Sequence, residues 1–496
     1  MELPTGAYAF RMKKYGSGKQ MNSQPGNQMY KHRTSRTRIE AHEGEVSFPP
    51  RAYAWYVVAV IFIAGSFAFI DRIVVSLVTP ALQADLGLRD SQLGMLQGLA
   101  FALFYVLFGI PLGIIADRWN RQRLLTVGIS IWSLMTASCG LCTGFGSLFL
   151  ARLGVGAGEA SLNPSVTSLI SDYFPPRVRP RAIAGYVMGQ GFGHGLTYVF
   201  GGMLLGWLAT RGGLVLPVLG HVKPWQAMFL IVGVAGLFPT LLFGLTVREP
   251  KRLEIANKST GRASAADVIA FMRLNRMTLA CHHFGIALTT MTAIGFANWM
   301  PTFFLRVHHW PPQRFSVFYG AINIIFGIGA PLAAGWLATW WKERGTIDAA
   351  WRLALYGSIG CTVCGALAPL MPTPELSLAV YILAGLCASP PAVLAYVAIS
   401  EFVPNEMRGT IIAVYFLVSG LVSNGFGPVA VGLATDYLFK DNAAIGRSLS
   451  FVSFATGLPA AVLLMAGLRS FRQSIGRATW VARASTQPPV ASGVPH

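Results

Sequence analysis

Apolar runs of about 20 residues recur along the whole chain, and each is long enough to cross a bilayer as a helix. Only 12% of the 496 residues are charged and 53% are hydrophobic, whereas a soluble protein carries about 25% charged residues. Backbone polar groups in hydrocarbon must be satisfied internally, and runs of this length satisfy them as helices. The sequence therefore predicts an all-α membrane protein.

Twelve runs fit this description and set the predicted organisation of the chain. They cover 54–78, 91–115, 124–142, 146–170, 182–208, 226–246, 277–304, 315–340, 351–371, 376–400, 409–438 and 448–468. An even number of spans places both termini on the same side of the membrane. We expect a disordered basic tail at 1–50, a six-helix bundle at 51–246, a linker at 247–276, a second six-helix bundle at 277–468 and a tail at 469–496.

The distribution of basic residues predicts which side the termini occupy. Of the 39 Lys and Arg residues, we place 30 in the tails and in the loops on their side, seven in the opposite loops and two within spans. Excess Lys and Arg marks the cytoplasmic side, so both termini are expected there. The net charge of +19 is explained as a topology signal that also attracts anionic lipid, and a nucleic-acid partner is not expected.

Motifs for catalysis or metal binding are missing from the sequence. All six cysteines fall within predicted spans, and the pairs Cys139/Cys142 and Cys361/Cys364 have no histidine or further cysteine beside them. Buried cysteine usually serves as a small apolar residue. The chain also lacks a phosphate-binding Gly-Lys-Ser/Thr loop and a His/Glu cluster with metal-ligand spacing. We therefore expect no metal, no cofactor and no enzyme activity.

Four charged residues fall inside the predicted spans. Arg152 and Glu159 lie in the fourth span, two helical turns apart, so they face the same way. Glycines at 154, 156 and 158 let another helix approach that face closely. Asp71 and Arg72 lie in the first span. A charge at this depth costs at least a few kcal/mol unless it faces a partner or a wet cavity. The pattern indicates one wall of a polar pathway; the alternative is a structural ion pair that ties helices together.

The depths of these residues suggest their pairing. Asp71 and Arg152 fall at similar depth and could meet, whereas Glu159 lies about 10 Å deeper. Arg72 is within reach of either Glu159 or Asp71, and the sequence leaves both pairings open. Two acids and two bases balance in charge, as a site of low dielectric requires.

A tight basic turn follows the second span. The segment that runs from the end of that span through the turn contains Gly113, Asp117, Arg118 and Arg121. A topology signal accounts for the arginines, but not for the acid at a fixed distance from the glycine. We therefore expect this turn to have a role of its own.

The second half of the chain repeats features of the first. Residues 335–339 match 113–117 at an offset of 222, Cys361 and Cys364 match Cys139 and Cys142 at the same offset, and Pro404 and Arg408 match Pro175 and Arg179 at an offset of 229. Three matches in order predict two pseudo-symmetric six-helix halves, as in one large transporter fold.

The repeat is chemically uneven. Thr339 replaces Asp117, and the seventh and tenth spans carry no acid or base apart from His282 and His283. The charged machinery is therefore expected in the N-terminal half. Candidates for polar or aromatic contacts in a central cavity are Gln190, His194, Asn298, Trp299, Asn323, Tyr396 and Asn424. For each of them the alternative is an interhelical hydrogen bond or an interfacial anchor.

These motifs resemble the major facilitator superfamily. Gly113-x-x-x-Asp117-Arg118-x-x-Arg121 resembles its signature loop between helices two and three, with Asn120 in place of the usual glycine. The segment from Arg152 to Gly-Glu159-Ala resembles the helix-four motif of its proton-coupled members. Within the superfamily the chain most resembles the bacterial spinster-like branch. The segments that carry this resemblance are 69–72, 94–105, 111–119, 156–161, 299–303 and 425–428.

The resemblance implies a major facilitator fold and a secondary transporter that works by alternating access on an amphipathic or lipid-like small molecule. Proton symport or antiport is then expected to use Asp71, Arg152 and Glu159, with Arg72 beside them. The main alternative is proton-coupled transport of a small organic anion or drug, with Arg72 and Arg152 holding a carboxylate. A non-transporting receptor or scaffold on the same fold is a second alternative.

The resemblance also implies a conformational latch in the basic turn. Asp117 is expected to face the start of the eleventh helix near Arg408, where a helix N-terminus favours an anion. Arg118 or Arg121 is expected to pair with Asp172 at the end of the fourth helix. We expect a monomer in the inner membrane of a bacterium, with both termini cytoplasmic.

Overall fold

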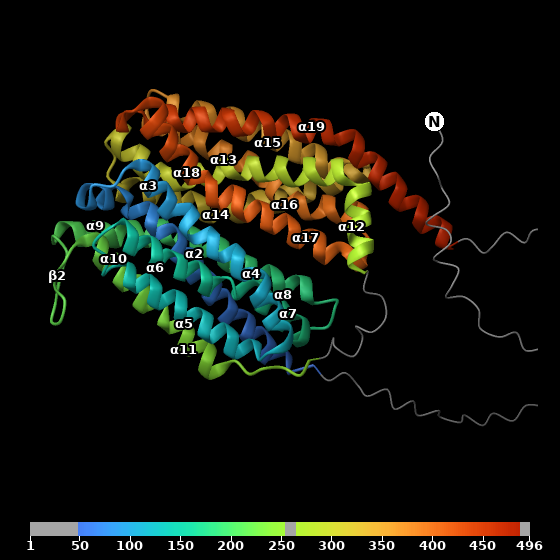
Figure 1. Ribbon diagram of the computed structural model, residues 1–496, viewed down its shortest axis with the longest axis horizontal. Coiled ribbons are helices and arrows are strands. Elements are labelled where there is room, and N and C mark those ends of the chain that lie inside the picture. The colour runs from blue at the N-terminus through green and yellow to red at the C-terminus, as the bar shows by residue number, and fades with distance from the viewer. Residues whose placement is uncertain (1–47, 253–263, 487–496) are drawn as a thin grey trace, which may run out of the picture. The chain divides into compact units, whose positions relative to one another are not determined.

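The computed structural model describes residues 48–252 and 264–486, and these are almost entirely helical (Figure 1). The all-α prediction is confirmed. The predicted N-terminal tail lies outside the described residues except for its last three positions. The helices of the N-terminal half, coloured blue to green, pack chiefly with one another, as do the yellow-to-red helices of the C-terminal half (Figure 1).

Helices form most of the N-terminal half, and a short hairpin lies between the fifth and sixth spans. The elements are α2 (Arg51–Leu86), α3 (Asp90–Gly94), η2 (Met95–Leu99), α4 (Ala100–Arg118), α5 (Arg121–Cys139), α6 (Phe145–Glu159), α7 (Leu162–Tyr173), α8 (Arg179–Leu196), η3 (Thr197–Gly201), α9 (Gly202–Thr210), β1 (Leu214–Leu216), β2 (Gly220–Val222), α10 (Pro224–Ala235) and α11 (Leu237–Thr246). The strands β1 and β2 pair antiparallel, with Val215 opposite His221. The π-helical turns η2 and η3 each continue a helix without ending it.

The C-terminal half follows a short linker helix. The elements are α12 (Ala265–Leu274), α13 (Arg276–His308), α14 (Pro312–Glu343), α15 (Ala349–Leu367), η5 (Ala368–Leu370), α16 (Pro374–Phe402), α17 (Asn405–Ser419), η6 (Gly420–Gly425), α18 (Phe426–Leu433), η7 (Ala434–Phe439), η8 (Asn442–Ala444) and α19 (Ile445–Thr486). Here η6 and η7 are π-helical turns within the eleventh span.

Each predicted span coincides with a helical segment, although the segments differ in how apolar they are. Nine helices among the described residues are long and apolar enough to cross a membrane. The predicted third, fourth and fifth spans correspond to α5, to α6 and α7, and to α8, η3 and α9. They fall short because α5 begins with charged residues, because the fourth span is broken near Ser161, and because the fifth contains many glycines together with Gln190 and His194.

Two segments outside the predicted spans also contain helix. The predicted C-terminal tail from 469 is helical as far as Thr486, because α19 continues beyond the apolar run. The predicted linker also contains a helix, α12, which begins with a capping box between Ser264 and Asp267. An apolar run marks the membrane-embedded part of a helix, whereas caps and polar turns decide where the helix ends.

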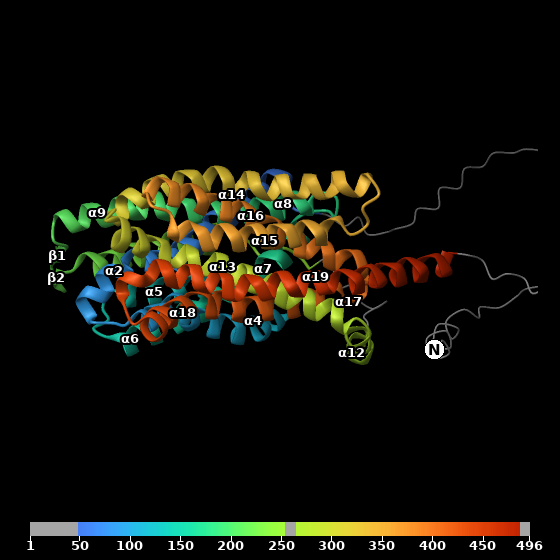
Figure 2. The ribbon, with the colours of Figure 1, turned by 90° about the horizontal axis from the view of Figure 1, so that it is seen from above.

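The hydrophobic core is continuous between the halves at one end of the bundle and divided at the other. We name the ends by what they carry: the hairpin end has β1, β2 and α3, and the linker end has α12 and the C-terminal part of α19 (Figure 1, Figure 2). One cluster of buried residues near the hairpin end joins both halves, including Leu77 with Phe303 and Phe315. Two further clusters toward the linker end belong to a single half each. The halves are therefore closed against each other at the hairpin end.

Glycines let the halves approach closely where they cross. A Cβ atom added at Gly98 of η2 would lie 2.5 Å from the carbonyl oxygen of Asn424 in η6. One added at Gly94 would lie 2.5 Å from the carbonyl oxygen of Pro428. On the other side of the bundle, Gly195 of α8 packs in the same way against Ile324 of α14. Helices α3–α4, α8–α9, α14 and α17–α18 thus approach closely between the halves, and α2 also contacts α13 there.

Candidate functional site

A buried ion pair lies at the centre of the N-terminal half. Arg72 of α2 and Glu159 of α6 are joined by a contact of 2.6 Å between Nη2 and Oε2, and Arg72 Nε also donates to Oε2 at 2.7 Å. The Glu159 side chain is fully buried, whereas 22% of the Arg72 side chain is exposed. The Arg72 guanidinium also stacks on Phe101, 4.4 Å from its ring centroid. Of the two pairings that the sequence left open, the structure contains the one with Glu159.

Arg152 and Asp71 lie side by side without a side-chain ion pair. Arg152 Nη1 donates to the backbone oxygen of Asp71 at 3.1 Å. Within residues 48–252 and 264–486, both carboxyl oxygens of Asp71 and the Nε and Nη2 atoms of Arg152 are buried without a hydrogen-bond partner. Asp71 and Arg152 therefore lie close together, as the sequence suggested, but the hydrogen bond between them uses the backbone oxygen of Asp71. Buried polar atoms without partners cost roughly 1–3 kcal/mol each, so this arrangement is expected to serve a function other than stability.

A chain of hydrogen bonds runs between the surroundings of Arg72 and helix α8. Gln190 Nε2 donates to Tyr186 Oη at 2.8 Å, Tyr186 Oη donates to Asn163 Oδ1 at 2.6 Å, and Asn163 Nδ2 donates to Tyr105 Oη at 2.6 Å. The ring of Tyr105 lies 5.0 Å from the Arg72 guanidinium carbon. Gln190 was predicted from the sequence, but its partners were not. The sequence signal for these partners was their spacing, since Asn163 lies four residues after Glu159 and Gln190 lies four residues after Tyr186.

The basic turn after α4 is held within the N-terminal half. Arg121 Nη1 lies 2.5 Å from Asp172 Oδ2, and Arg121 Nε lies 2.8 Å from Glu249 Oε1. Arg121 is thus the partner of Asp172, and Glu249 is a further partner that the sequence analysis missed. The C-terminus of α4 is capped by Arg252, which donates to the backbone oxygens of Ala116, Asp117 and Trp119.

Asp117 and Arg408 do not meet in this conformation. Asp117 and Arg118 are exposed, and Arg408 donates to the backbone oxygens of Ser400 and Val403 in its own half. The physical reason is the separation of the cores at the linker end. Gly113 lies near α7, where an added Cβ would be 3.8 Å from Pro164.

At the hairpin end, by contrast, charged groups join the two halves. Arg306 of α13 forms a bidentate ion pair with Asp90 of α3, with both N···O distances 2.7 Å, and it also donates to Gln83 of α2. Asp436 of η7 accepts the backbone N–H groups of Asp90 and Ser91 at 3.3 and 2.7 Å. We call Asp90, Arg306 and Asp436 the hairpin-end lock. The sequence analysis did not predict this lock. The available signal was the position of Asp90 at the start of a span, because a helix N-terminus favours an acidic side chain.

These contacts define one conformational state. Within the two described ranges, most hydrogen bonds and ion pairs between the halves lie at the hairpin end. Two deeper contacts join Tyr198 to the backbone oxygen of Ala297 at 2.8 Å and His194 to Asn323. The hairpin end is closed.

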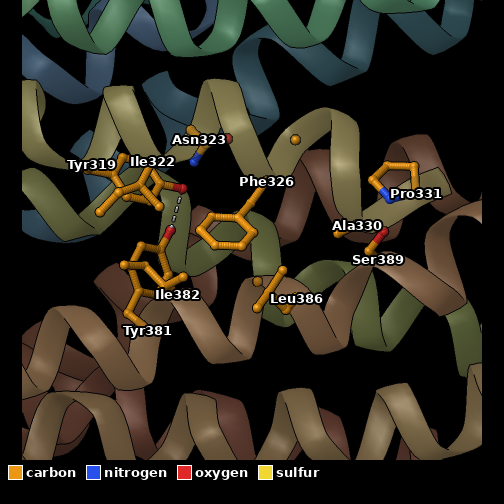
Figure 3. A pocket seen from close by; sticks show the side chains of 12 residues that line it. Tyr319, Ile322, Asn323, Phe326, Ala330, Pro331, Tyr381, Ile382, Leu386 and Ser389 are labelled. Atoms are coloured by element: carbon orange, nitrogen blue, oxygen red, sulfur yellow. Dashed lines mark hydrogen bonds between the residues drawn. The ribbon is translucent and has the colours of Figure 1, made fainter. Parts of the chain in front are cut away.

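A cavity of about 180 Å³ lies between α14 and α16 (Figure 3). Its wall is largely apolar, with Phe326 and Leu386 among the lining side chains, and its polar groups include Asn323 and Ser389. The hydroxyls of Tyr319 and Tyr381, 3.0 Å apart, close one end. His194 of the N-terminal half interacts with Asn323. The cavity is therefore suited to an apolar group beside a hydrogen-bonding one.

The remaining cavity candidates lie elsewhere. Asn298 bonds the oxygen of Ile294 in its own helix, and Trp299 is buried and donates to the oxygen of Pro428. Tyr396 packs on aromatic rings of α17, and Asn424 lies at the close approach to Gly98. Of the seven candidates, only Asn323 lines the cavity in Figure 3.

Comparison with known proteins agrees with this architecture. A family model described as Major Facilitator Superfamily matches residues 61–428. An MFS-type efflux pump of Mycolicibacterium smegmatis is 26% identical over 430 residues, which are 85% of this chain and 94% of that protein. A probable L-galactonate transporter of Escherichia coli is 22% identical over 391 residues, 76% of this chain and 82% of that one.

The fold is also found among solved structures. A bacterial homologue of the human lysosomal transporter Spinster, in an inward-facing and occupied conformation, superposes with a TM-score of 0.69 at 25% identity, covering 89% of this chain and 100% of that one. The predicted spinster-like resemblance is thus confirmed. The match of the family model over most of the chain, on a bundle of two helical halves, shows that the protein belongs to the Major Facilitator Superfamily of membrane transporters.

Proposed function

We propose that this protein is a proton-coupled secondary transporter that moves an amphipathic, lipid-like small molecule by alternating access. The observation that carries the proposal is the buried pair of Arg72 and Glu159 beside Arg152 and Asp71. Ionisable groups at this depth mark substrate, ion or proton pathways. The part exposure of Arg72 gives this group access to water while Glu159 stays buried.

Glu159 is the proton site in this proposal. In the observed state its carboxylate is compensated by Arg72. A buried carboxylate that loses a cationic partner is protonated more readily, because low dielectric disfavours the uncompensated charge. Movement of Arg72 away from Glu159 would therefore load a proton, and its return would release the proton.

The two ends of the bundle supply the alternation. The linker end carries the basic residues and is assigned to the cytoplasm by the positive-inside rule, so the observed state would be open to the cytoplasm. Closing that end would bring Asp117 toward Arg408 and would require the hairpin-end lock to open. The latch therefore consists of Gly113, Asp117, Arg118 and Arg408, while Arg121 and Asp172 hold the turn in shape.

The cavity of Figure 3 supports the proposed substrate class. Its wall is apolar except for a few groups such as Asn323 and Ser389, which suits a hydrocarbon portion beside a small polar head. The spinster-like resemblance of the sequence implies the same class. The second candidate is a small organic anion. It is supported by the buried Nε and Nη2 atoms of Arg152, which lack a hydrogen-bond partner among the described residues, and by the relative named as a probable L-galactonate transporter.

Transport into liposomes tests the proton role. Purified protein would be reconstituted, and accumulation of a radiolabelled lysophospholipid would be measured with and without a pH gradient. Glu159→Gln should abolish gradient-driven accumulation while exchange without a gradient continues. The matched control, Glu375→Gln, changes an exposed acid and should leave both rates unchanged. Undiminished gradient-driven accumulation by Glu159→Gln would remove Glu159 from the proton role.

Competition separates the two substrate classes. Unlabelled lysophospholipid should displace the label, whereas sugar acids should not. Competition by sugar acids alone would favour the organic anion.

A further inference from the structure

The strand β1 is apolar on both faces. On one face Leu214 and Leu216 pack against the core, and Val222 is buried. On the other face the side chain of Val215 is 78% exposed. A strand with one face in water normally alternates apolar and polar residues. The outward side of β1 therefore does not have the composition of a water-facing strand, whereas β2 places His221 opposite Val215 on that face.

The turn of the hairpin is also apolar. Strand pairing places Leu216 opposite Gly220, which leaves a three-residue turn, Pro217 to Leu219, closed by Gly220 at φ 68°. Turns in water favour Gly, Asn, Asp and Ser. Here Val218 is 93% exposed and Leu219 is 47% exposed. Together with Val215, these two residues form the apolar tip.

The position of the hairpin places the apolar tip at the membrane surface. Figure 1 shows the hairpin leaving the ends of α9 and α10 and running across the direction of the helices. Helices α10 and α11 together form a span long and apolar enough to cross the membrane. A hairpin that runs across the end of such a span lies in the plane of the bilayer surface.

The base of the hairpin is fixed to the N-terminal half. Lys223 forms an ion pair with Asp85 at the end of α2, and Trp225 Nε1 donates to the other carboxyl oxygen of Asp85 at 2.9 Å. The base therefore holds the direction of the hairpin, while the apolar tip extends from it.

We propose that the apolar tip inserts into the lipid leaflet at the hairpin end and anchors the N-terminal half there. The neighbouring residues support lipid as the partner. Trp207 is 43% exposed near the end of α9, with the Arg211 guanidinium 4.3 Å from its ring centroid. Tryptophan and basic residues are typical of the membrane–water interface. A stable protein partner would need about 800 Å² and 20–30 residues a side, far more than three side chains offer.

A fluorescent label tests the proposal on the full-length protein in liposomes. Val218→Cys would be labelled with an environment-sensitive dye and exposed either to nitroxide-bearing lipids or to a water-soluble quencher. The matched control is Ala443→Cys, an exposed position on η8 at the same end. Labelled wild-type protein measures the background from the six native cysteines, and thermal melting confirms that both variants fold.

Insertion predicts a clear difference between the two positions. Because interfacial anchors sit about 5–10 Å into the headgroup region, the lipid quencher should act at least about twofold more strongly at 218 than at 443, with blue-shifted emission at 218. The water-soluble quencher should show the reverse order. Equal access of the water-soluble quencher to both positions would overturn the proposal. Protection that appears only at high protein density, with self-quenching of the dye, would also overturn it and would indicate contact between copies.

Discussion

The two ends of the bundle use the same kind of ion pair in opposite ways. At the hairpin end, Arg306 pairs with Asp90 across the halves. At the linker end, the pair of Arg121 and Asp172 lies within the N-terminal half. A pair between halves must break when that end opens, whereas a pair inside one half can persist through the whole cycle. The location of the partner, more than the strength of the pair, therefore decides the role. We call the pair of Arg306 and Asp90, which is part of the hairpin-end lock, the gate, and the pair of Arg121 and Asp172 the brace.

The largest expected effect is at the brace. Arg121→Ala removes the guanidinium that compensates the buried Asp172 and the neighbouring Glu249. Breaking a buried pair by removing one partner costs about 3–5 kcal/mol, so the variant should melt at a much lower temperature in detergent. Arg123→Ala, which changes an exposed arginine on the same turn, should melt like wild type. Similar melting of the two variants would contradict a bracing role.

The gate should respond differently from the brace. Arg306→Ala should shift the balance between the closed and open hairpin end by about 1–3 kcal/mol, with a smaller loss of stability because its side chain is 14% exposed. Spin labels at positions 89 and 437, whose native side chains meet across the halves, should report longer distances. Arg447→Ala, an exposed arginine at the same end, is the control.

A double variant sharpens this test. If Arg306 and Asp90 act only through each other, Asp90→Ala combined with Arg306→Ala should shift the distances less than the sum of the single variants. Additive shifts would show that the two residues act separately.

The smallest effect is expected for an exposed pair. Lys342 and Glu401 pair within the C-terminal half, and the lysine side chain is 58% exposed. Exposed pairs contribute about 0–1 kcal/mol, and here one partner is exposed while the Glu401 side chain is 9% exposed. Lys342→Ala should therefore lower the melting temperature less than Arg121→Ala or Arg306→Ala and should leave the spin-label distances unchanged. A large destabilisation would mean that exposure alone does not rank these pairs.

The sequence predicted the charged group around Arg72 and Glu159 better than the hairpin-end lock, for a physical reason. A charge inside an apolar run stands out by itself, so Arg72, Arg152 and Glu159 could be found and their pairing narrowed by helical spacing. Asp90 and Arg306 lie at the ends of spans, where charges are ordinary. Only the tertiary arrangement brings these two residues together, across 216 positions of sequence.

Sequence patterns also failed to predict some features of the helices themselves. Hydropathy located every span but not the C-terminal end of α19 or the helix α12. The helix α19 continues through polar residues beyond its apolar run, and α12 begins at a capping box. The π-helical turns left no hydropathy signal either, because one extra residue in a turn changes the hydrogen bonding without changing composition.

These π-helical turns have a mechanical consequence. The turns η2, η3 and η6 lie in three of the helices that cross between the halves. A turn with i to i+5 bonding holds one residue more than an α-helical turn, so returning it to α-helical bonding would rotate one part of the helix against the other. Each of these helices thus has a built-in joint, at which its two segments can swivel without the backbone giving up its hydrogen bonds.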